Sequence, residues 1–577
     1  MKWTALLPLT IGAFLTATAF RFVIHTPMPA EAQKATTATR QKQLAIRCVP
    51  DYVPAAGDDI PALTGWGNYR WKVSTPSDSA QYYFSQGMAM YYAFHIIESR
   101  ASFDKATRFD STFAMAWWGK ALSFGPNIND FGYQPPSEAY PSALAAVRLK
   151  GRCTPVEKAL INAIAARYSA DTTAKQADLN EKYRDAMSRV SQQFPQNADV
   201  AALYADALML LHPWDLYNHD FSPKAWTPKI VAAIKNALRL SPRHPGANHY
   251  LIHAVEASAR PGDALKSADL LATAMPSVSH ITHMPSHVYI RTGYYQKGMK
   301  LNTQAVDGFK NYTAAFAPVT DGLFLYSLHN LHMKMACAHM AGNYSEALSA
   351  AKDLQGQIPA DYLNLPNAMG NYLQYVHQSP LFTYIRFGKW NEILQEKTGS
   401  DLPYAKVLQH FGRGLAYARL NRSSEAASEA AQMAMAMQQE GLKEPFTPFN
   451  SAYDGAVVAR HILAGTIALQ QQQLAEAITQ FQQAVTAEDK LIYDEPRDWL
   501  LPARHYLGDA LLRAGQDEEA LAVLQKDLQI NPSNGWALTG LQLAFEQLHR
   551  TGAIITAKQR LKNAWLVKDV EIKRPVF

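Results

Sequence analysis

Histidines gather in one part of this chain, at spacings that suit metal coordination. Nine of the eighteen histidines lie between His244 and His339. The stretch "SVSHITHMPSHVYIRTGYY" alone contains His280, His283 and His287. Neutral imidazole is the commonest protein ligand for transition metals, and two histidines four residues apart on a helix can hold one ion from one face. The spacing therefore indicates a metal site as the first hypothesis.

The histidines also recur at one position of a repeated helix pair. In three successive helix pairs, a small residue marks the second helix, and a histidine lies fifteen residues before it. Three more histidines lie about one helical turn from these positions. Positions three or four residues apart share a helix face. The predicted metal ligands on one concave surface are therefore His249, His253, His283, His287, His329 and His332. Pro285, between His283 and His287, must either begin a helix or kink it.

The ligand types narrow the chemistry without deciding it. Six imidazoles with few carboxylates argue against Mg²⁺ or Ca²⁺ and favour copper over zinc or iron. Two sites of three histidines would suit a binuclear copper centre for oxygen chemistry, whereas one such site would suit hydrolysis or oxidation. The pairs "HYLIH" and "HMPSH" lack the glutamate of the zincin motif, which disfavours a metalloprotease. A groove that binds an anionic ligand, and plain packing of the rings, stay open as alternatives.

Two glutamates are the candidate catalytic residues. Glu256 occupies a further inward slot of the same repeats, and Glu495 lies in the C-terminal stretch "YDEPRDWLLPARHYLGDALL". If the last repeats return over the groove, Glu495 would act as a general acid or base, or as a carboxylate ligand. In the alternative interpretation this stretch is only a turn between helices, in which Asp498 and Arg504 form a surface ion pair.

A helical repeat must position these residues. From Ser77 onward, apolar residues recur at three- and four-residue intervals, short turns separate the segments, and strand signals are nearly absent. The aligned small residues Ala264 and Gly298 are 34 residues apart (298 − 264), which is the period of the tetratricopeptide repeat (TPR). We therefore predict an all-α fold, an α-solenoid in which antiparallel helix pairs stack as a TPR superhelix.

The chain divides into three expected regions. Residues 1–32 combine Lys2, an apolar run and the small-x-small triplet "AEA" at 30–32, which predicts a signal peptide. Arg21 interrupts the apolar part, so an N-terminal membrane anchor is the alternative. Residues 33–76 form an extended segment, and residues 77–577 form the repeat array, with histidine-rich repeats at 244–340. We expect an exported protein, either periplasmic or extracellular.

Charge and cysteine content exclude other classes. The net charge of +6 is spread along the chain without a Lys/Arg tract, so no nucleic-acid partner is expected. The three cysteines, Cys48, Cys153 and Cys337, form neither a CxxC motif nor a disulfide framework. A Cys48–Cys153 pair in an oxidising compartment and three unpaired thiols are both open. The oligomeric state is not determined by the sequence.

Several long stretches resemble a group of bacterial, commonly exported TPR proteins. The matching stretches include "AMAWWGKALSFGPNIN", "HPWDLY", "HPGANHYLIHAVEAS", "HITHMPSHVYIRTGYY" and "LHNLH", followed by a Glu-Pro-x-x-Trp motif that begins at Glu495. The resemblance covers most of the chain after about Ala80 and implies the repeat fold and a shared histidine-rich groove, but no settled activity. This chain has Phe94-His95-Ile96 where relatives tend to have Phe-Asn-His, and Arg497 where a second proline usually follows Glu-Pro.

The leading interpretation is a TPR protein that binds a transition metal in its concave groove, with copper-type oxidation as the first activity to consider. A small molecule or a peptide in the groove is the expected partner. The alternative is a scaffold that binds a peptide or protein without catalysis. Whether the protein is an enzyme is not decided by the sequence.

Overall fold

The computed structural model describes residues 59–129, 133–316, 324–396, 401–446 and 449–577. The predicted signal peptide or anchor at 1–32, the expected extended segment up to residue 58, and Cys48 of the Cys48–Cys153 pair lie outside this part. Among the described helices, none has the length and apolar character that a membrane span requires.

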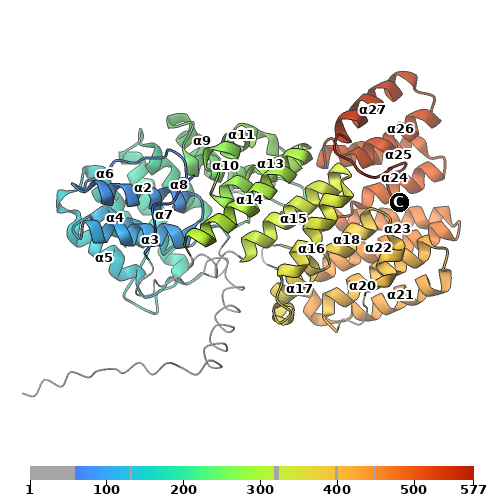
Figure 1. The fold of residues 1–577 in the computed structure, drawn as a ribbon, viewed down its shortest axis with the longest axis horizontal. Helices are drawn as coiled ribbons and strands as arrows, with labels where there is room; N and C mark the ends of the chain where they lie inside the picture. Colours follow the sequence, from blue (N-terminus) through green and yellow to red (C-terminus); the bar gives the residue numbers. More distant parts are fainter. Residues whose placement is uncertain (1–58, 130–132, 317–323, 397–400, 447–448) are drawn as a thin grey trace, which may run out of the picture. The chain divides into compact units, whose positions relative to one another are not determined.

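The described chain folds into helices joined by turns and a few longer loops (Figure 1). The helices of the first half are α2 (Asp78–Tyr92), α3 (Ile96–Phe109), α4 (Ala114–Ser123), α5 (Ala139–Leu149), α6 (Pro155–Ala165), α7 (Gln176–Gln193), α8 (Ala198–Met209), α9 (Thr227–Leu240), α10 (Pro245–Val255), α11 (Leu265–Ala274), α12 (Ser279–His283) and α13 (Pro285–Thr292). Two short 3₁₀ helices, Lys150–Arg152 and Pro261–Ala264, lie among them.

The second half continues the same pattern. Its helices are α14 (Tyr295–Ala315), α15 (Phe324–Ala341), α16 (Tyr344–Gln357), α17 (Asn367–His377), α18 (Ser379–Arg386), α19 (Trp390–Gln395), α20 (Pro403–Arg419), α21 (Ser423–Ala436), α22 (Ala452–Gln470), α23 (Leu474–Glu488), α24 (Ala503–Arg513), α25 (Asp517–Ile530), α26 (Gly535–Gln547) and α27 (Thr551–Ala564). The 3₁₀ helices here are Tyr362–Asn364 and Glu440–Lys443.

Consecutive helices pack against each other because each buries an apolar stripe that it cannot bury alone. Helix α2 packs on α3, α14 on α15, α22 on α23, and α24 on α25. Within the described ranges, β structure is limited to two isolated bridges, Tyr217–Pro223 and Pro445–Ser451. The predicted all-α solenoid of helix pairs is confirmed.

Proline residues decide where two histidine-bearing helices begin. Helix α10 starts at Pro245, directly after its N-cap residue His244. Helix α12 ends at His283, and α13 begins at Pro285. Proline has no N–H and its φ is fixed, so it suits the first position of a helix. Of the two outcomes that the sequence left open, the chain therefore starts a new helix at Pro285.

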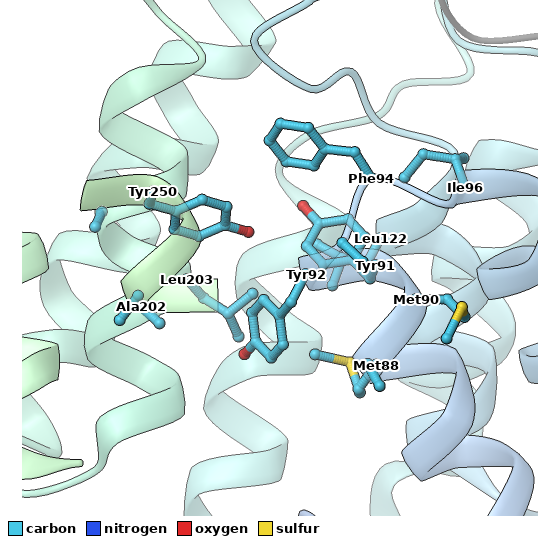
Figure 2. Close-up of a cluster of buried hydrophobic side chains, with 14 of the residues drawn as sticks. Met88, Met90, Tyr91, Tyr92, Phe94, Ile96, Leu122, Ala202, Leu203 and Tyr250 are labelled. Atoms are coloured by element: carbon cyan, nitrogen blue, oxygen red, sulfur yellow. The ribbon is translucent and has the colours of Figure 1, made fainter. Parts of the chain in front are cut away.

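Aromatic side chains of α2 hold this helix in register with α10. The ring of Tyr92 is buried and lies 6.3 Å from the ring of Tyr250, and Figure 2 shows Tyr250 reaching toward Tyr91 and Tyr92. The backbone of α10 comes close to the Tyr92 ring at Gly246, where an added Cβ would lie 2.3 Å from Cδ1 of Tyr92. This packing fixes the backbone carbonyl of Tyr92 beside His249, and it is the apolar burial in this core that stabilises the arrangement.

Candidate metal centre

Two helices bring a first group of three histidines together. His249 and His253 are one turn apart on α10, and His280 comes from α12. Nε2 of His249 lies 3.0 Å from Nε2 of His253 and 3.1 Å from Nε2 of His280. All three side chains are buried. The three Nε2 atoms therefore converge on one point.

A second group lies beside the first. It consists of His283 at the end of α12, His287 on α13, and His329 on α15. Nε2 of His287 lies 2.5 Å from Nε2 of His283 and 3.3 Å from Nε2 of His329. The ring centroids of His253 and His287, one from each group, are 6.1 Å apart. The structure thus forms two adjacent groups, each able to surround one ion.

The other ring nitrogen of four of these histidines is held by an oxygen atom. Nδ1 of His249 donates to the backbone carbonyl of Tyr92 at 2.7 Å, and Nδ1 of His283 donates to Oδ1 of Asn302 at 2.6 Å. Nδ1 of His253 and of His287 donate to the carboxylate of Glu256. Such partners fix the tautomer with its lone pair on Nε2, as is usual for metal-binding histidines.

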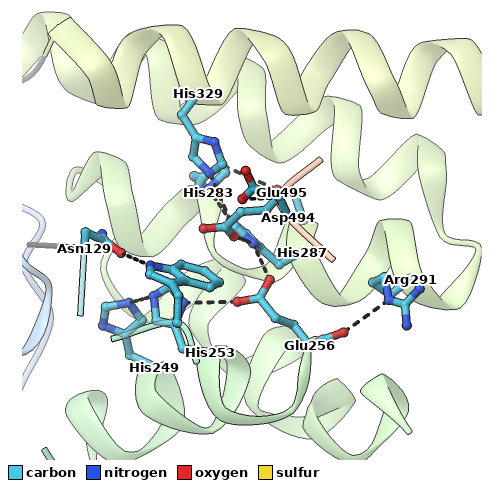
Figure 3. A network of polar contacts seen from close by, with 12 residues as sticks. Asn129, His249, His253, Glu256, His283, His287, Arg291, His329, Asp494 and Glu495 are labelled. Carbon is cyan, nitrogen blue, oxygen red and sulfur yellow. Dashed lines mark hydrogen bonds and ion pairs between the residues drawn. The ribbon is translucent and has the colours of Figure 1, made fainter. Parts of the chain in front are cut away.

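Glu256 joins the two groups. It follows the last residue of α10 and is fully buried. One carboxylate oxygen lies 3.1 Å from Nδ1 of His253, and the other lies 2.7 Å from Nδ1 of His287, as Figure 3 shows. Arg291 of α13 fixes this position because its Nε donates to the backbone carbonyl of Glu256 at 3.1 Å. The carboxylate therefore orients one ligand in each group instead of facing solvent.

The C-terminal motif returns to the site. Figure 3 shows Asp494 and Glu495 beside His283 and His329, and the Glu495 carboxylate contacts Nδ1 of His287. The same residue can form a mixed ligand set with His253 and Glu256. The sequence left open whether this motif is only a turn between helices, and its first residues lie at the site.

The surface ion pair between Asp498 and Arg504, which belonged to the alternative interpretation of this stretch, does not form. Asp498 accepts a hydrogen bond from Nδ2 of Asn450 at 2.6 Å, and Arg504 binds both carboxylate oxygens of Asp489 at 2.6 and 2.7 Å. Arg504 therefore forms a bidentate pair with Asp489, which matches the geometry of the planar guanidinium.

Burial keeps the imidazoles neutral. It lowers the pKa of His249, His253 and His287 to about 3. Burial also lowers the pKa of His280, His283 and His329 well below the usual range, and neighbouring imidazoles add to each shift. A neutral ring is the form that binds a metal ion. All six rings are therefore in the ligand-competent state at neutral pH.

The carboxyl groups of Asp494 and Glu495 have raised pKa values, in contrast to the lowered pKa values of the histidines. Burial raises the pKa of Glu495 well above its usual range, and the nearby carboxyls of Glu256 and Asp494 add to this shift. Burial, followed by the neighbouring Asp498, raises the pKa of Asp494 in the same direction. A cation bound among the histidines would offset this accumulation of negative charge.

Aromatic rings cover the first group. Phe94 has a left-handed backbone, with φ of 59°, and its ring centroid lies 4.4 Å from that of His249. Such a conformation is costly for a bulky residue and persists only where packing holds it. Trp214 meets the edge of His253 at 5.3 Å, and its Nε1 donates to Oδ1 of Asn129 at 2.9 Å. These contacts exclude water from one side of the site.

A cavity of about 110 Å³ opens against both histidine groups. His280 of the first group and His329 of the second line it, together with Asp494 and Glu495. The other lining residues are Asn129, Trp214, Leu325, Tyr326, Met369, Tyr372, Phe446 and Phe449. A small molecule in this cavity would face both groups at once.

Five of the six predicted ligands converge, and His332 does not. His332 is buried, neither ring nitrogen has a hydrogen-bond partner, and its ring lies 5.8 Å from that of Tyr375 on α17. Three residues along a helix amount to a rotation that falls about 60° short of a full turn. On α15, that difference is enough to point His329 into the site and His332 toward the next helix pair.

His280 takes the place that repeat counting assigned to His332. It was visible in the sequence as the first histidine of "HITH", but it lies outside the fifteen-residue slot. The short helix α12 places His280 and His283 three residues apart, so the two rings serve different groups. Aromatic rings and the C-terminal motif cover the predicted concave surface here, so these side chains are mostly buried.

Other supporting residues carried little sequence signal. Asn302, Trp214 and the carbonyl of Tyr92 come from outside the histidine-rich helices, and no local spacing links them to the site. His95, whose role the Phe-His-Ile sequence put in doubt, bonds Glu98 through Nδ1 at 2.7 Å. Its Nε2 accepts a hydrogen bond from the backbone N–H of His280 at 3.4 Å. His95 therefore holds the backbone of α12 in place without joining either histidine group.

Comparison with known proteins adds little to this geometry. No protein-family model and no curated protein matches the chain. The chain is similar to the solved structure of the human IFIT1 dimer with m7Gppp-AAAA, at 13% identity over 92% of this chain and 95% of that one, with a TM-score of 0.30. It is also similar to the P58(IPK) TPR domain, at 10% identity over 84% and 92%, with a TM-score of 0.19. Likenesses this low carry no argument about function, and the fold stands on the helices described above.

Proposed function

We propose that the protein binds two transition-metal ions, one in each histidine group, and that it is a metal-dependent oxidoreductase acting on a small molecule. Copper is favoured over zinc or iron. The first ion is held by His249, His253 and His280, and the second by His283, His287 and His329. The N-terminal sequence supports a periplasmic or extracellular location for this activity.

One observation carries the metal proposal: two pairs of hydrogen-bond acceptors face each other inside the protein. His249 and His253 each donate their Nδ1 proton to an oxygen, so each Nε2 carries a lone pair, yet these atoms are 3.0 Å apart. His283 and His287 repeat the pattern at 2.5 Å. Two buried lone pairs at such distances repel unless a positive charge lies between them.

A metal ion meets this requirement better than a proton does. Burial and the neighbouring rings disfavour a charged imidazole, which removes protonation as the remedy at neutral pH. Metal–nitrogen bonds of about 2.0–2.1 Å in a tetrahedral site place neighbouring nitrogens about 3.3 Å apart. The contacts of 3.0, 3.1 and 3.3 Å between Nε2 atoms are close to that spacing, and the 2.5 Å contact between His283 and His287 is shorter than it.

The ligand set supports copper and redox chemistry. Both groups consist of imidazole alone, and of the described cysteines, Cys153 and Cys337, neither belongs to a ligand group. Imidazole sites bind copper more tightly than the other divalent ions of the first transition row. Three protein ligands leave a coordination position for a substrate or an oxidant such as dioxygen, and the cavity supplies the access.

Metal content of the full chain, purified without a histidine tag, tests the proposal. Plasma mass spectrometry after addition of copper, zinc or iron should find two equivalents of copper in the wild type. His249→Ala and His329→Ala, which leave the residues that bond Glu256 in place, should each lose one equivalent. His461→Ala, outside both groups, is the control and should retain two. Trace metal as purified and no uptake of any of the three would overturn the proposal.

A further inference from the structure

The cavity beside the two histidine groups has an aromatic wall. The rings of Tyr372 and Phe446 are stacked at 5.6 Å with planes 10° apart, and Phe446 stacks on Phe449 at 6.1 Å and 15°. The wall continues from Phe449 to Trp214 at 5.8 Å, and Trp214 reaches His253. Stacked and edge-on contacts with such rings favour a flat aromatic ligand over an aliphatic one.

Two carboxyl groups of the same cavity lie beside the histidines. Asp494 and Glu495 contribute the carboxyl groups of the lining, next to His280 and His329. A carboxyl oxygen there accepts a hydrogen bond from a hydroxyl or amino group on a ligand. One end of the cavity is therefore suited to a hydrogen donor, and the rest to a ring.

The size of the cavity limits the ligand to one ring. Its volume is about 110 Å³. An apolar protein cavity that holds a benzene molecule is larger, about 150 Å³, so a single ring already fills this cavity and extends toward its open side. Apart from the aromatic rings, Leu325 and Met369 complete the apolar lining, and both are partly buried. A second fused ring would have to displace these side chains.

We infer that the cavity binds a monocyclic aromatic molecule with a hydrogen-donating substituent, of the phenol or aniline type. The ring lies against the wall formed by Tyr372, Phe446, Phe449 and Trp214, and the substituent points to Asp494 or Glu495. This rests on the proposed function in one respect, since a ring in this position is the substrate of the two metal sites.

Calorimetric titration of the full chain tests the inference, with phenol as the main probe and metal content measured on the same samples. Toluene lacks the donor, cyclohexanol lacks the aromatic ring, and 2-naphthol has a second ring. Phenol should bind, and each of the other three should bind about tenfold more weakly or worse. The titration is run on copper-loaded and on chelator-treated protein.

Filling the cavity provides the matched variants. Met369→Trp should abolish phenol binding while the metal content stays at the wild-type value. Met435→Trp, at a position that is 55% exposed on α21, should leave phenol binding unchanged. If Met369→Trp does not fold, Leu325→Phe replaces it with the same expected result.

The two proposals fail separately. Two equivalents of metal without phenol binding, or phenol binding that survives the cavity-filling substitution, would overturn the aromatic ligand and leave the metal sites standing. Equal binding of phenol and toluene would remove the role of the carboxyl groups and overturn the inference as stated. Phenol binding to a chain that takes up no metal would support the cavity's ligand class and overturn the proposed function.

Discussion

Asn302 fixes the protonation pattern of His283. Oδ1 of Asn302 lies 2.6 Å from Nδ1 of His283, and Nδ2 of the same amide donates to the carbonyl of Gly298 at 2.9 Å. The second bond prevents the amide from reversing, so its oxygen must face the imidazole. His283 therefore carries its proton on Nδ1, and its Nε2 lone pair faces His287.

Replacing Asn302 with alanine should weaken metal binding in the second group. Loss of such a partner typically reduces metal affinity about 10–100-fold, and the unsatisfied groups should cost on the order of 1–3 kcal/mol of unfolding free energy. Competition with a chelator measures the affinity. Asn248→Ala is the control, because Nδ2 of that buried amide bonds only backbone carbonyls of Pro242 and His244. Equal affinity in both variants would show that the His283 tautomer is not set by Asn302.

His329 and His332 should respond differently to the same substitution. His332→Leu removes two buried nitrogens that lack partners, so the unfolding free energy should stay constant or rise by about 1 kcal/mol, with full metal content. His329→Leu should lower the metal content by one equivalent. Urea unfolding and plasma mass spectrometry give both quantities. A loss of metal in His332→Leu would restore the ligand role that repeat counting assigned to it.

Glu488 should make the stability of the wild type depend on pH. Its carboxyl is buried and accepts from the backbone N–H of Ala503 at 2.8 Å. Burial raises its pKa from 4.5 to about 7, against the opposing effect of Arg497 and Arg504 and alongside the like charge of Asp527. The pKa of Glu488 is higher in the folded protein than in the unfolded chain. The contribution of the protonated Glu488 to folding stability is therefore complete below about pH 4.5 and is lost as the pH rises through about 7.

The variant Glu488→Gln keeps an acceptor for Ala503 and cannot ionise. Relative to the wild type, its unfolding free energy should therefore rise between pH 4.5 and pH 8, by roughly 3 kcal/mol at most. Urea unfolding of both proteins across this range gives the difference. A difference that stays constant with pH would mean that Glu488 does not titrate in this window.

Two glycines should show how tightly α10 is packed. Gly246→Ala places a Cβ 2.3 Å from the buried ring of Tyr92 and should cost about 1–3 kcal/mol of unfolding free energy. Gly552→Ala on α27 meets no atom within 4 Å and should be neutral or stabilising by up to about 1 kcal/mol, because alanine favours helix. Denaturant titration of both variants checks this. If Gly246→Ala were as stable as the wild type, the packing of α2 on α10 would be looser than described.

The helices and the general place of the site could be predicted from the sequence. Apolar spacing of three and four residues fixes a helix and its buried face locally, since each residue advances a helix by a constant angle. The same constancy put His249 and His253 on one face of α10. His283 and His287 lie on different helices, so their contact did not follow from helical spacing alone. The missing N–H of Pro285 also limited the backbone there to two possibilities, a new helix or a kink.

Tertiary structure alone decided which rings converge in one group. His280 joins His249, and His332 turns away, because the position of α12 and the rotation of α15 depend on how neighbouring helix pairs stack. Glu495 reaches His287 only because a distant loop packs back on the histidine-rich helices, and no periodic pattern in the chain encodes that contact. Spacing along one helix is a local property, whereas the meeting of side chains from different helices is set by the packing of the whole array.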